Sequence, residues 1–177
     1  MRTLLAAIAA VILAACGQAA APTEADAQTS SAVVTGDVTA AERTAILAAM
    51  QLRANAQGQV QNECGDLVTP EFRPLDLGSG VGRAVAFIIG GGPSAAACYG
   101  DGPLIVVYRN TAGAWREIYQ LRGGVMIILS TQHRNANDVA NGGPGFSFPV
   151  MEWNGNTYAH ANREVGDAAT SDARFVP

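Results

Sequence analysis

Apolar positions recur first at the spacing of a helix and then, further along the chain, at the spacing of strands. Thr39 and Glu42 match a capping box, in which the threonine hydroxyl accepts from the third helical N–H and the glutamate reaches back. Apolar side chains then recur at helical intervals from Ile46 onward. Gly58 stands where a helix is expected to have stopped. The pattern predicts one amphipathic helix over residues 40–56.

Beyond this helix the chain consists of short β-branched and aromatic runs bounded by Gly, Pro and Asn, which is typical of strands. Asn154-Gly155 predicts a tight hairpin whose two central residues both need a positive φ, and residues 110–113 predict a slightly longer turn. Pro149 indicates an edge strand or a bulge. The expected strands are 85–89, 104–108, 115–121, 125–129, 146–153 and 157–160.

Two units of this strand-rich region are similar. A Gly-Pro pair, a strand and an aromatic hairpin follow one another from Gly102, and again from Gly143, at an offset of about 40 residues. A strand precedes each unit, at 83–89 and at 125–130. We therefore predict a mainly β fold, with the N-terminal helix and two antiparallel meanders of three to four strands. Two such units are too few for a propeller and would pack as a small sandwich or a partial barrel.

Residues 75–161 resemble the blade-like repeats of exported bacterial proteins of the FG-GAP type. The resemblance rests on residues 76–82 before one strand, on Cys98 and the Gly-Pro pair at 102–103 before the next, and on the paired aromatic hairpins. Loops of this family often carry several carboxylates that bind calcium. Here only Asp76 has that position, with Gly and Ser where further oxygen ligands are needed. The resemblance implies a fold, and we expect neither a metal nor a cofactor.

The N-terminus has the pattern of an export signal. Arg2 is followed by twelve small or apolar residues at 4–15, fewer than the roughly 20 that a membrane-spanning helix needs. Leu13-Ala14-Ala15-Cys16 resembles the lipobox of bacterial lipoproteins, which implies that Cys16 carries the lipid. The alternative is an ordinary signal peptide with a chance cysteine. Gly17 after the cysteine, by resemblance to lipoprotein sorting signals, favours the periplasmic face of the bacterial outer membrane.

Four segments are expected: a signal peptide at 1–15, a flexible tether at 16–38, one β-rich domain at 39–165 and a flexible tail at 166–177. Export places Cys64 and Cys98 in an oxidising compartment, so we predict a disulfide between them; the alternative is two buried thiols. Neither cysteine has a second Cys or His nearby at metal-ligand spacing.

Composition excludes some partners. The formal net charge is −4, and every basic residue is Arg or His, without clustering. Nucleic acid binding needs clustered basic side chains that replace phosphate counterions, so no nucleic acid partner is expected. Attachment to a membrane would depend on the acyl chains, because the charge balance disfavours binding to anionic headgroups.

The polar run at 130–138 is the main candidate for chemistry. Ser130, His133 and Asp138 are the residue types of a hydrolytic triad, although the chain has no Gly-x-Ser-x-Gly elbow. His133, Arg134 and Asp138 are alternatively contacts for a ligand or partner, or members of an ordinary solvated loop. His160 is expected on a sheet surface or in the core rather than as a metal ligand.

These observations favour a non-enzymatic binding or structural module for an envelope protein or a glycan. Its binding face is expected in the long, Gly-rich loops at 90–102 and 131–145, since loops on rigid β scaffolds carry most binding function. Two alternatives stay open. One is an inhibitor of cell-wall hydrolases of the lysozyme type, and the other is a hydrolase that uses His133.

Overall fold

In the part of the chain that the structure describes, one α-helix precedes the strands, and it is shorter than the sequence predicts. The computed structural model describes residues 36–90 and 95–176. Helix α1 covers Ala40–Ala49, and Thr39 and Glu42 make both hydrogen bonds of the predicted capping box. Gln51 has a φ of 59°, a left-handed conformation in which a helix cannot continue. The predicted end at residue 56 is therefore wrong.

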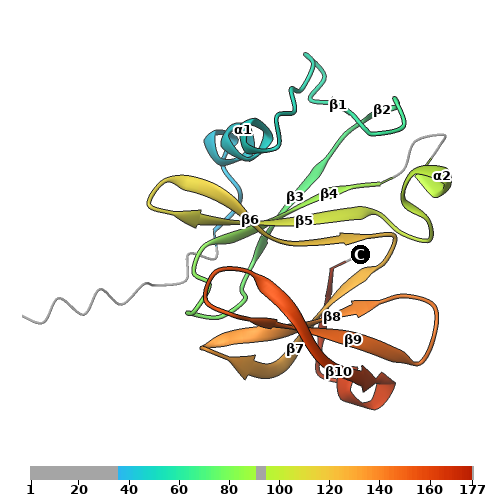
Figure 1. The fold of residues 1–177 in the computed structure, drawn as a ribbon. Coiled ribbons are helices and arrows are strands. Elements are labelled where there is room, and N and C mark those ends of the chain that lie inside the picture. The colour runs from blue at the N-terminus through green and yellow to red at the C-terminus, as the bar shows by residue number, and fades with distance from the viewer. Residues whose placement is uncertain (1–35, 91–94, 177) are drawn as a thin grey trace, which may run out of the picture. The chain divides into compact units, whose positions relative to one another are not determined.

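The first sheet is a four-stranded antiparallel meander in the order β3-β4-β5-β6 (Figure 1). A two-stranded ribbon, β1-β2, lies before it in the chain, and a short helix, α2, interrupts the connection between β4 and β5. The elements are β1 (Val60–Gln61), β2 (Leu67–Val68), β3 (Glu71–Leu75), β4 (Ala84–Ile89), α2 (Ala95–Tyr99), β5 (Leu104–Thr111) and β6 (Ala114–Arg122).

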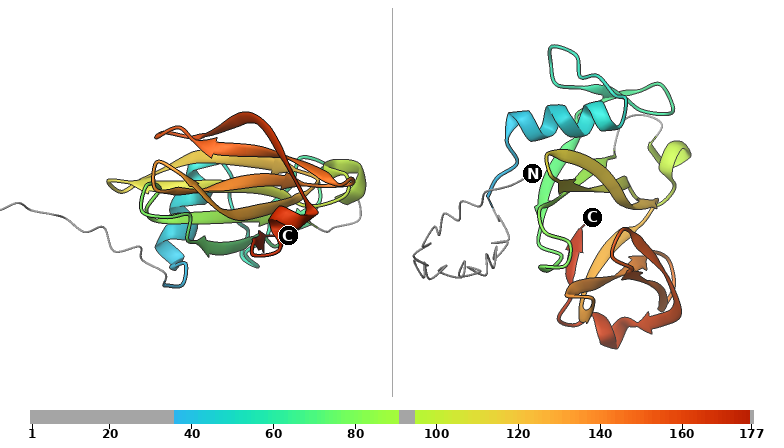
Figure 2. Two further views of the ribbon diagram at one scale, coloured as in Figure 1. Left: turned by 90° about the horizontal axis from the view of Figure 1, so that it is seen from below. Right: turned by 60° about the vertical axis from the view of Figure 1, so that its left-hand side comes forward.

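The second sheet has five antiparallel strands in the order β10-β9-β8-β7-β11. Its strands β7 to β10 form a second meander, after which the chain passes through the 3-10 helix η1 and reaches the opposite edge of the sheet (Figures 1 and 2). The elements are β7 (Val125–His133), β8 (Ala136–Gly142), β9 (Ser147–Trp153), β10 (Tyr158–Gly166), η1 (Asp167–Thr170) and β11 (Arg174–Val176).

The predicted fold class is confirmed: the chain is mainly β, with a helix and two antiparallel meanders packed as a sandwich. Three details differ. The tail expected to be flexible from residue 166 contains η1 and β11, and β11 pairs with β7. The loop predicted at 131–145 contains the end of β7 and all of β8, and β8 was not predicted because Asn, Asp and Gly make up four of its seven residues and hide the strand pattern. The two meanders therefore correspond strand by strand, β3 to β7 and β4 to β8. The strand predicted at 83–89, which is β4, corresponds to β8 and not to β7, the strand predicted at 125–130.

The two predicted hairpin turns are present with their lengths exchanged. Trp153 pairs with Tyr158 across four intervening residues, and of these only Gly155 has a positive φ. In the other hairpin Ala112 and Gly113 both have a positive φ, so this turn is the tight one.

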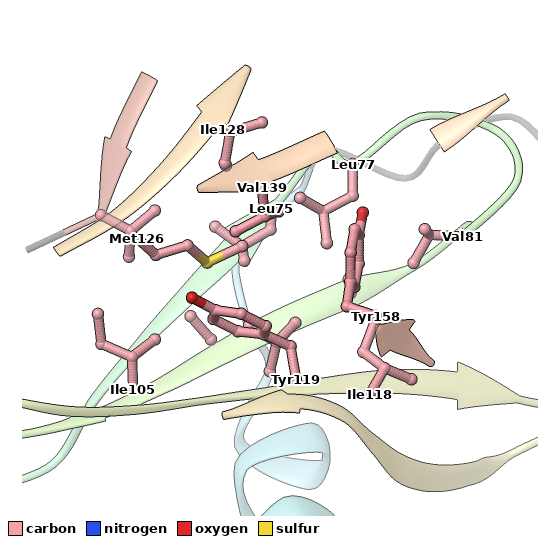
Figure 3. Packing of buried hydrophobic residues seen from close by; sticks show 14 of the residues in the cluster. Leu75, Leu77, Val81, Ile105, Ile118, Tyr119, Met126, Ile128, Val139 and Tyr158 are labelled. Atoms are coloured by element: carbon pink, nitrogen blue, oxygen red, sulfur yellow. The ribbon is translucent and has the colours of Figure 1, made fainter. Parts of the chain in front are cut away.

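The main core lies between the two sheets. Figure 3 shows Met126 and Val139 of the five-stranded sheet facing Ile105 and Tyr119 of the four-stranded sheet. The hydroxyl of Tyr119 donates to Asn141 Oδ1 at 2.6 Å, which joins the two sheets through a polar contact. The four strand aromatics are buried as well, with Tyr119, Trp153 and Tyr158 in this core and Trp115 on the other face of the four-stranded sheet.

A second core covers the other face of the four-stranded sheet. Val85, Phe87 and Val106 pack there against Ile46 of α1 and Val60 of β1, so that the helix lies on one side of this sheet and the five-stranded sheet on the other (Figures 1 and 2). This arrangement buries all six residues of β4.

An ion pair and a disulfide connect the elements on this face of the four-stranded sheet to one another and to the chain around the sheet. Arg83 donates to both carboxylate oxygens of Glu42, at 3.1 Å each, and to the carbonyl of Gly36 at 2.9 Å. Cys64 and Cys98 lie at disulfide distance, with 5.8 Å between their Cα atoms, and thereby connect the β1-β2 turn to α2. The predicted cysteine pairing is present.

Alkaline pH should unfold this protein through its tyrosines. Burial raises the pKa of Tyr108 to about 12, and burial also raises the pKa of Tyr119 and Tyr158. Unfolded phenols ionise near pH ~10, so the unfolded chain loses protons first. The tyrosines therefore make their whole contribution to the free energy of unfolding below pH ~10, and this contribution is lost as the pH rises toward 12.

The measurement is urea unfolding between pH 8 and 12, together with phenolate absorbance of the folded protein. Lysine is absent from the sequence and arginine titrates higher still, so the four tyrosines account for the effect. Phenolate absorbance that appears in the folded protein near pH 10 would contradict this prediction.

Candidate functional site

The five-stranded sheet has a second face, directed away from the four-stranded sheet, which we call the outer face. Side chains alternate along its strands, so that Met126 and Ile128 enter the main core while Ile127 and Leu129 lie on the outer face. A small apolar cluster occupies the middle of this face: Ile127, Leu129, Ala140, Phe148 and Val150, with Val125, Ala161, Val165 and Ala173 partly buried around them.

One end of the outer face has a pocket of about 380 Å³, which we call the apolar hollow. Val125, Phe148 and Phe175 contribute its apolar walls, and Asp101 is the charged residue of its lining. Phe175 is 54% exposed, and Phe146, which follows the hollow's Pro144 in the chain, is 84% exposed. Large exposed aromatic side chains beside a concave apolar surface are typical of an interaction site.

Glycines allow the backbone segments around the hollow to approach each other closely. A Cβ atom on Gly124 would lie 2.5 Å from the carbonyl oxygen of Gly142, and one on Gly102 would lie 2.7 Å from the amide nitrogen of Gly124. Real Cβ atoms do not come this close to backbone, so larger residues do not fit here. The packing brings Asp101, from the predicted loop at 90–102, and Gly143, from the one at 131–145, to the same pocket.

The other end of the outer face has a group of charged side chains, which we call the polar cluster. Two β-bulges shape it. In the pairing of β7 with β8, residues 129–131 lie opposite Asp138 alone, and in the pairing of β10 with β9, residues 161–163 lie opposite Val150 alone. Bulges change the direction of side chains and often lie next to functional sites. Here the two bulges lie where β7, β8, β9 and β10 each contribute at least one polar side chain to the cluster.

Asp138 is the centre of the polar cluster and is fully buried. Its Oδ2 accepts from the Thr131 hydroxyl at 2.6 Å and from an Arg163 guanidinium nitrogen at 2.7 Å. Its Oδ1 lies 2.7 Å from His133 Nδ1. A buried carboxylate needs such partners, because an isolated buried charge is costly. Glu152 completes the cluster: its Oε1 accepts from Arg163 Nε at 3.0 Å and lies 3.4 Å from His133 Nε2.

The structure therefore brings His133 and Asp138 together, as the triad interpretation of the sequence requires, but the hydroxyl that joins them, that of Thr131, contacts Asp138 and not the imidazole. In a hydrolytic triad the second imidazole nitrogen faces the nucleophile, whereas His133 Nε2 faces the carboxylate of Glu152. The two ring nitrogens of His133 thus contact Asp138 and Glu152, and neither of these contacts involves Ser130. The arrangement can hold a proton or another cation between two carboxylates.

The remaining predicted contacts surround the polar cluster. Arg134 lies in the β7-β8 turn with a φ of 52°, and together with His133, Glu152 and His160 it lines a surface pocket of about 360 Å³. The interpretation of 130–138 as a solvated loop is wrong, since it forms the end of β7, a tight turn and the start of β8.

Sequence reasoning missed Thr131, Glu152 and Arg163. One signal was available, since Glu152 interrupts the apolar positions that alternate along β9 from Phe148 and Val150. Its partners could not be identified, because the bulges that bring them together have no clear signature in the sequence.

Comparison of the chain with protein-family models, with curated proteins and with solved structures gives no match. The resemblance of residues 75–161 to FG-GAP repeats thus stays a prediction. Cys16 and the expected signal peptide lie outside the described residues. Within residues 36–90 and 95–176, no helix has the length and apolar character that crossing a membrane requires.

Asp138→Asn should destabilise the fold far more than the equivalent change at Glu152. The amide removes a charge from a fully buried side chain that contacts Thr131, His133 and Arg163. Hydrogen bonds to charged groups contribute about 2 kcal/mol each. We expect a loss of about 2 kcal/mol or more in the free energy of unfolding.

Glu152→Gln is the matched control, because its ion pair with Arg163 is partly exposed and such pairs contribute less than about 1 kcal/mol. Urea unfolding at pH 7 measures both variants. Equal losses in the two would show that Asp138 does not organise the cluster.

Proposed function

We propose that this chain is a non-enzymatic binding module of the bacterial envelope whose apolar hollow takes an apolar side chain of a protein partner. The observation that carries the proposal is the exposed Phe175 in the wall of a preformed pocket of about 380 Å³, together with the exposed Phe146, which follows Pro144 of the same lining by two residues in the chain. Burying such aromatic surface supplies much of the binding free energy in protein interfaces.

The chemistry of the hollow favours a protein over a glycan. A sugar ring has apolar C–H faces, but the hydroxyl groups around its edge need hydrogen-bond partners, so a glycan site needs several polar side chains. Asp101 is the charged residue of the lining, while Val125, Phe148 and Phe175 are apolar. We therefore expect the partner to insert a Leu, Ile, Met or aromatic side chain, with a basic residue nearby to pair with Asp101.

We place the protein at the periplasmic face of the outer membrane in this proposal, where acyl chains on Cys16 would anchor it. This part of the proposal rests on the sequence: the lipobox-like Leu13-Ala14-Ala15-Cys16 and the Gly that follows it. Two or more acyl chains hold a protein stably on a membrane, whereas one does so weakly. The residues between the anchor and α1 would then separate the binding module from the membrane surface.

Cys16→Ser should release the protein from the membrane fraction. In cells labelled with radioactive palmitate, the unchanged chain should incorporate label and sediment with membranes after an alkaline wash. The variant should do neither. Cys64→Ser is the control for loss of a cysteine as such, and it should keep the label. A variant at residue 16 that still incorporates palmitate would contradict the proposed anchor.

Photo-crosslinking at the apolar hollow should trap the partner. We would place p-benzoylphenylalanine at Phe146 or Phe175 in the full chain, in cells of the native host. Leu67 is the matched control, since it is also a large apolar residue and is 57% exposed, yet it lies in β2 and does not line the hollow. We expect a defined protein adduct from 146 and 175 and none from 67.

A second variant tests whether the phenylalanine side chains contribute to the binding of the partner or only lie near it. Phe175→Ser, combined with the crosslinker at 146, should reduce the adduct at least about tenfold, as expected for a side chain that contributes 1.4 kcal/mol or more. Adducts that resist protease but are removed by muramidase would identify a glycan and overturn the choice of a protein partner. Equal adducts from 67 and 146 would overturn the assignment of the hollow.

A further inference from the structure

The polar cluster carries a separate inference, which does not depend on the apolar hollow. His133, Asp138 and Glu152 offer one nitrogen and two carboxylate oxygens that all lie within 4.8 Å of one another. They come from β7, β8 and β9, the three neighbouring strands that form one end of the outer face. Imidazole together with carboxylate is a ligand set that suits zinc, copper and nickel ions.

The hydrogen bond between His133 and Asp138 sets the position of the imidazole proton. Asp138 is buried and its Oδ1 lies 2.7 Å from His133 Nδ1. An ionised carboxylate can only accept, so Nδ1 donates to it. In a neutral imidazole the lone pair then lies on Nε2, where a metal ion could bind. A carboxylate that orients a metal-binding histidine in this way is a common feature of zinc sites.

The lone pair of Nε2 faces a second acceptor. Glu152 Oε1 lies 3.4 Å from His133 Nε2. Two acceptors at this distance repel each other unless a cation lies between them. Nitrogen and oxygen ligands bound ~2.0–2.1 Å from a tetrahedral zinc ion are about 3.4 Å apart. The spacing of the two atoms is therefore that of two neighbouring ligands of one zinc ion.

The access to the site agrees with this geometry. His133 is 47% exposed and lines the pocket of about 360 Å³, which gives an ion and its remaining water ligands room to enter. Arg163 contributes one positive charge against the two carboxylates of Asp138 and Glu152. Arg134 lines the same pocket and adds a second positive charge, so the two arginines balance the two carboxylates, and the case for a metal ion rests on the ligand geometry.

His160 lines the same pocket but is not a suitable ligand. Its Nδ1 accepts from the backbone N–H of Asn162 at 3.0 Å, which places the proton of the neutral ring on Nε2. His160 therefore provides a matched control: a second histidine at the same surface, without the carboxylate that exposes a lone pair on His133.

We propose that His133 Nε2 and Glu152 bind a divalent transition-metal ion such as Zn²⁺, with Asp138 as the positioning carboxylate behind the histidine. The remaining coordination positions would be taken by water. Calcium and magnesium prefer sites made of oxygen ligands alone, so the site should discriminate against them.

The test is isothermal titration of the full, untagged chain with ZnCl₂ at pH 7.5, repeated with CaCl₂. We expect one zinc ion per chain and no calcium binding. His133→Gln and Glu152→Gln should each weaken zinc binding at least about tenfold, whereas His160→Gln should leave the dissociation constant within about twofold. Circular dichroism of each variant checks that it is folded.

X-ray absorption at the zinc edge should show one imidazole ligand in the unchanged chain and none in His133→Gln. Three results would overturn the proposal: no zinc binding by the unchanged chain, binding of calcium as tight as that of zinc, or an equal loss in His160→Gln and His133→Gln. Any of these would leave the polar cluster as an ion-pair network that stabilises the sheet.

Discussion

Strand β4 is buried on both faces, and the rest of the structure depends on this constraint. Its side chains alternate between two cores, with Val85 and Phe87 on one side and Ala84 and Ala86 on the other. A strand without a polar face needs a covering layer on each side. The helix with the β1-β2 ribbon supplies one layer, and the five-stranded sheet supplies the other. The outer face of the five-stranded sheet is then directed away from both of these cores.

The parts of this fold that could be predicted are those that depend on neighbouring residues. The capping box at Thr39 and the β-branched run of β4 act within a few residues, and both are present. Helix α1 ended early because Gln51 adopts a left-handed conformation, which glutamine does not signal. Strand β8 could not be foreseen, because its pairing with β7 and β9 overrides the weak strand preference of Asn, Asp and Gly.

The polar cluster also consists of a part that neighbouring residues indicate and a part that depends on tertiary contacts. His133 and Asp138 were singled out because they lie close together in a polar run, and they do form a pair. Glu152 and Arg163 complete that pair from strands far along the chain, in a register that two bulges determine. The apolar hollow depends on the approach of backbone segments at Gly102, Gly124 and Gly142. No local pattern reports such tertiary contacts, and the segment predicted as a loop at 131–145 is largely strand for the same reason.

Strand β11 has a consequence for the behaviour of the molecule at high concentration. It pairs with Met126, Ile127 and Ile128, which are among the most apolar residues of β7. An open strand edge of this composition would offer its free N–H and C=O groups to other chains, which is a common route to aggregation. By occupying that edge, three residues keep β7 from acting as a template, so proteolytic trimming beyond η1 would favour fibrous or amorphous self-association.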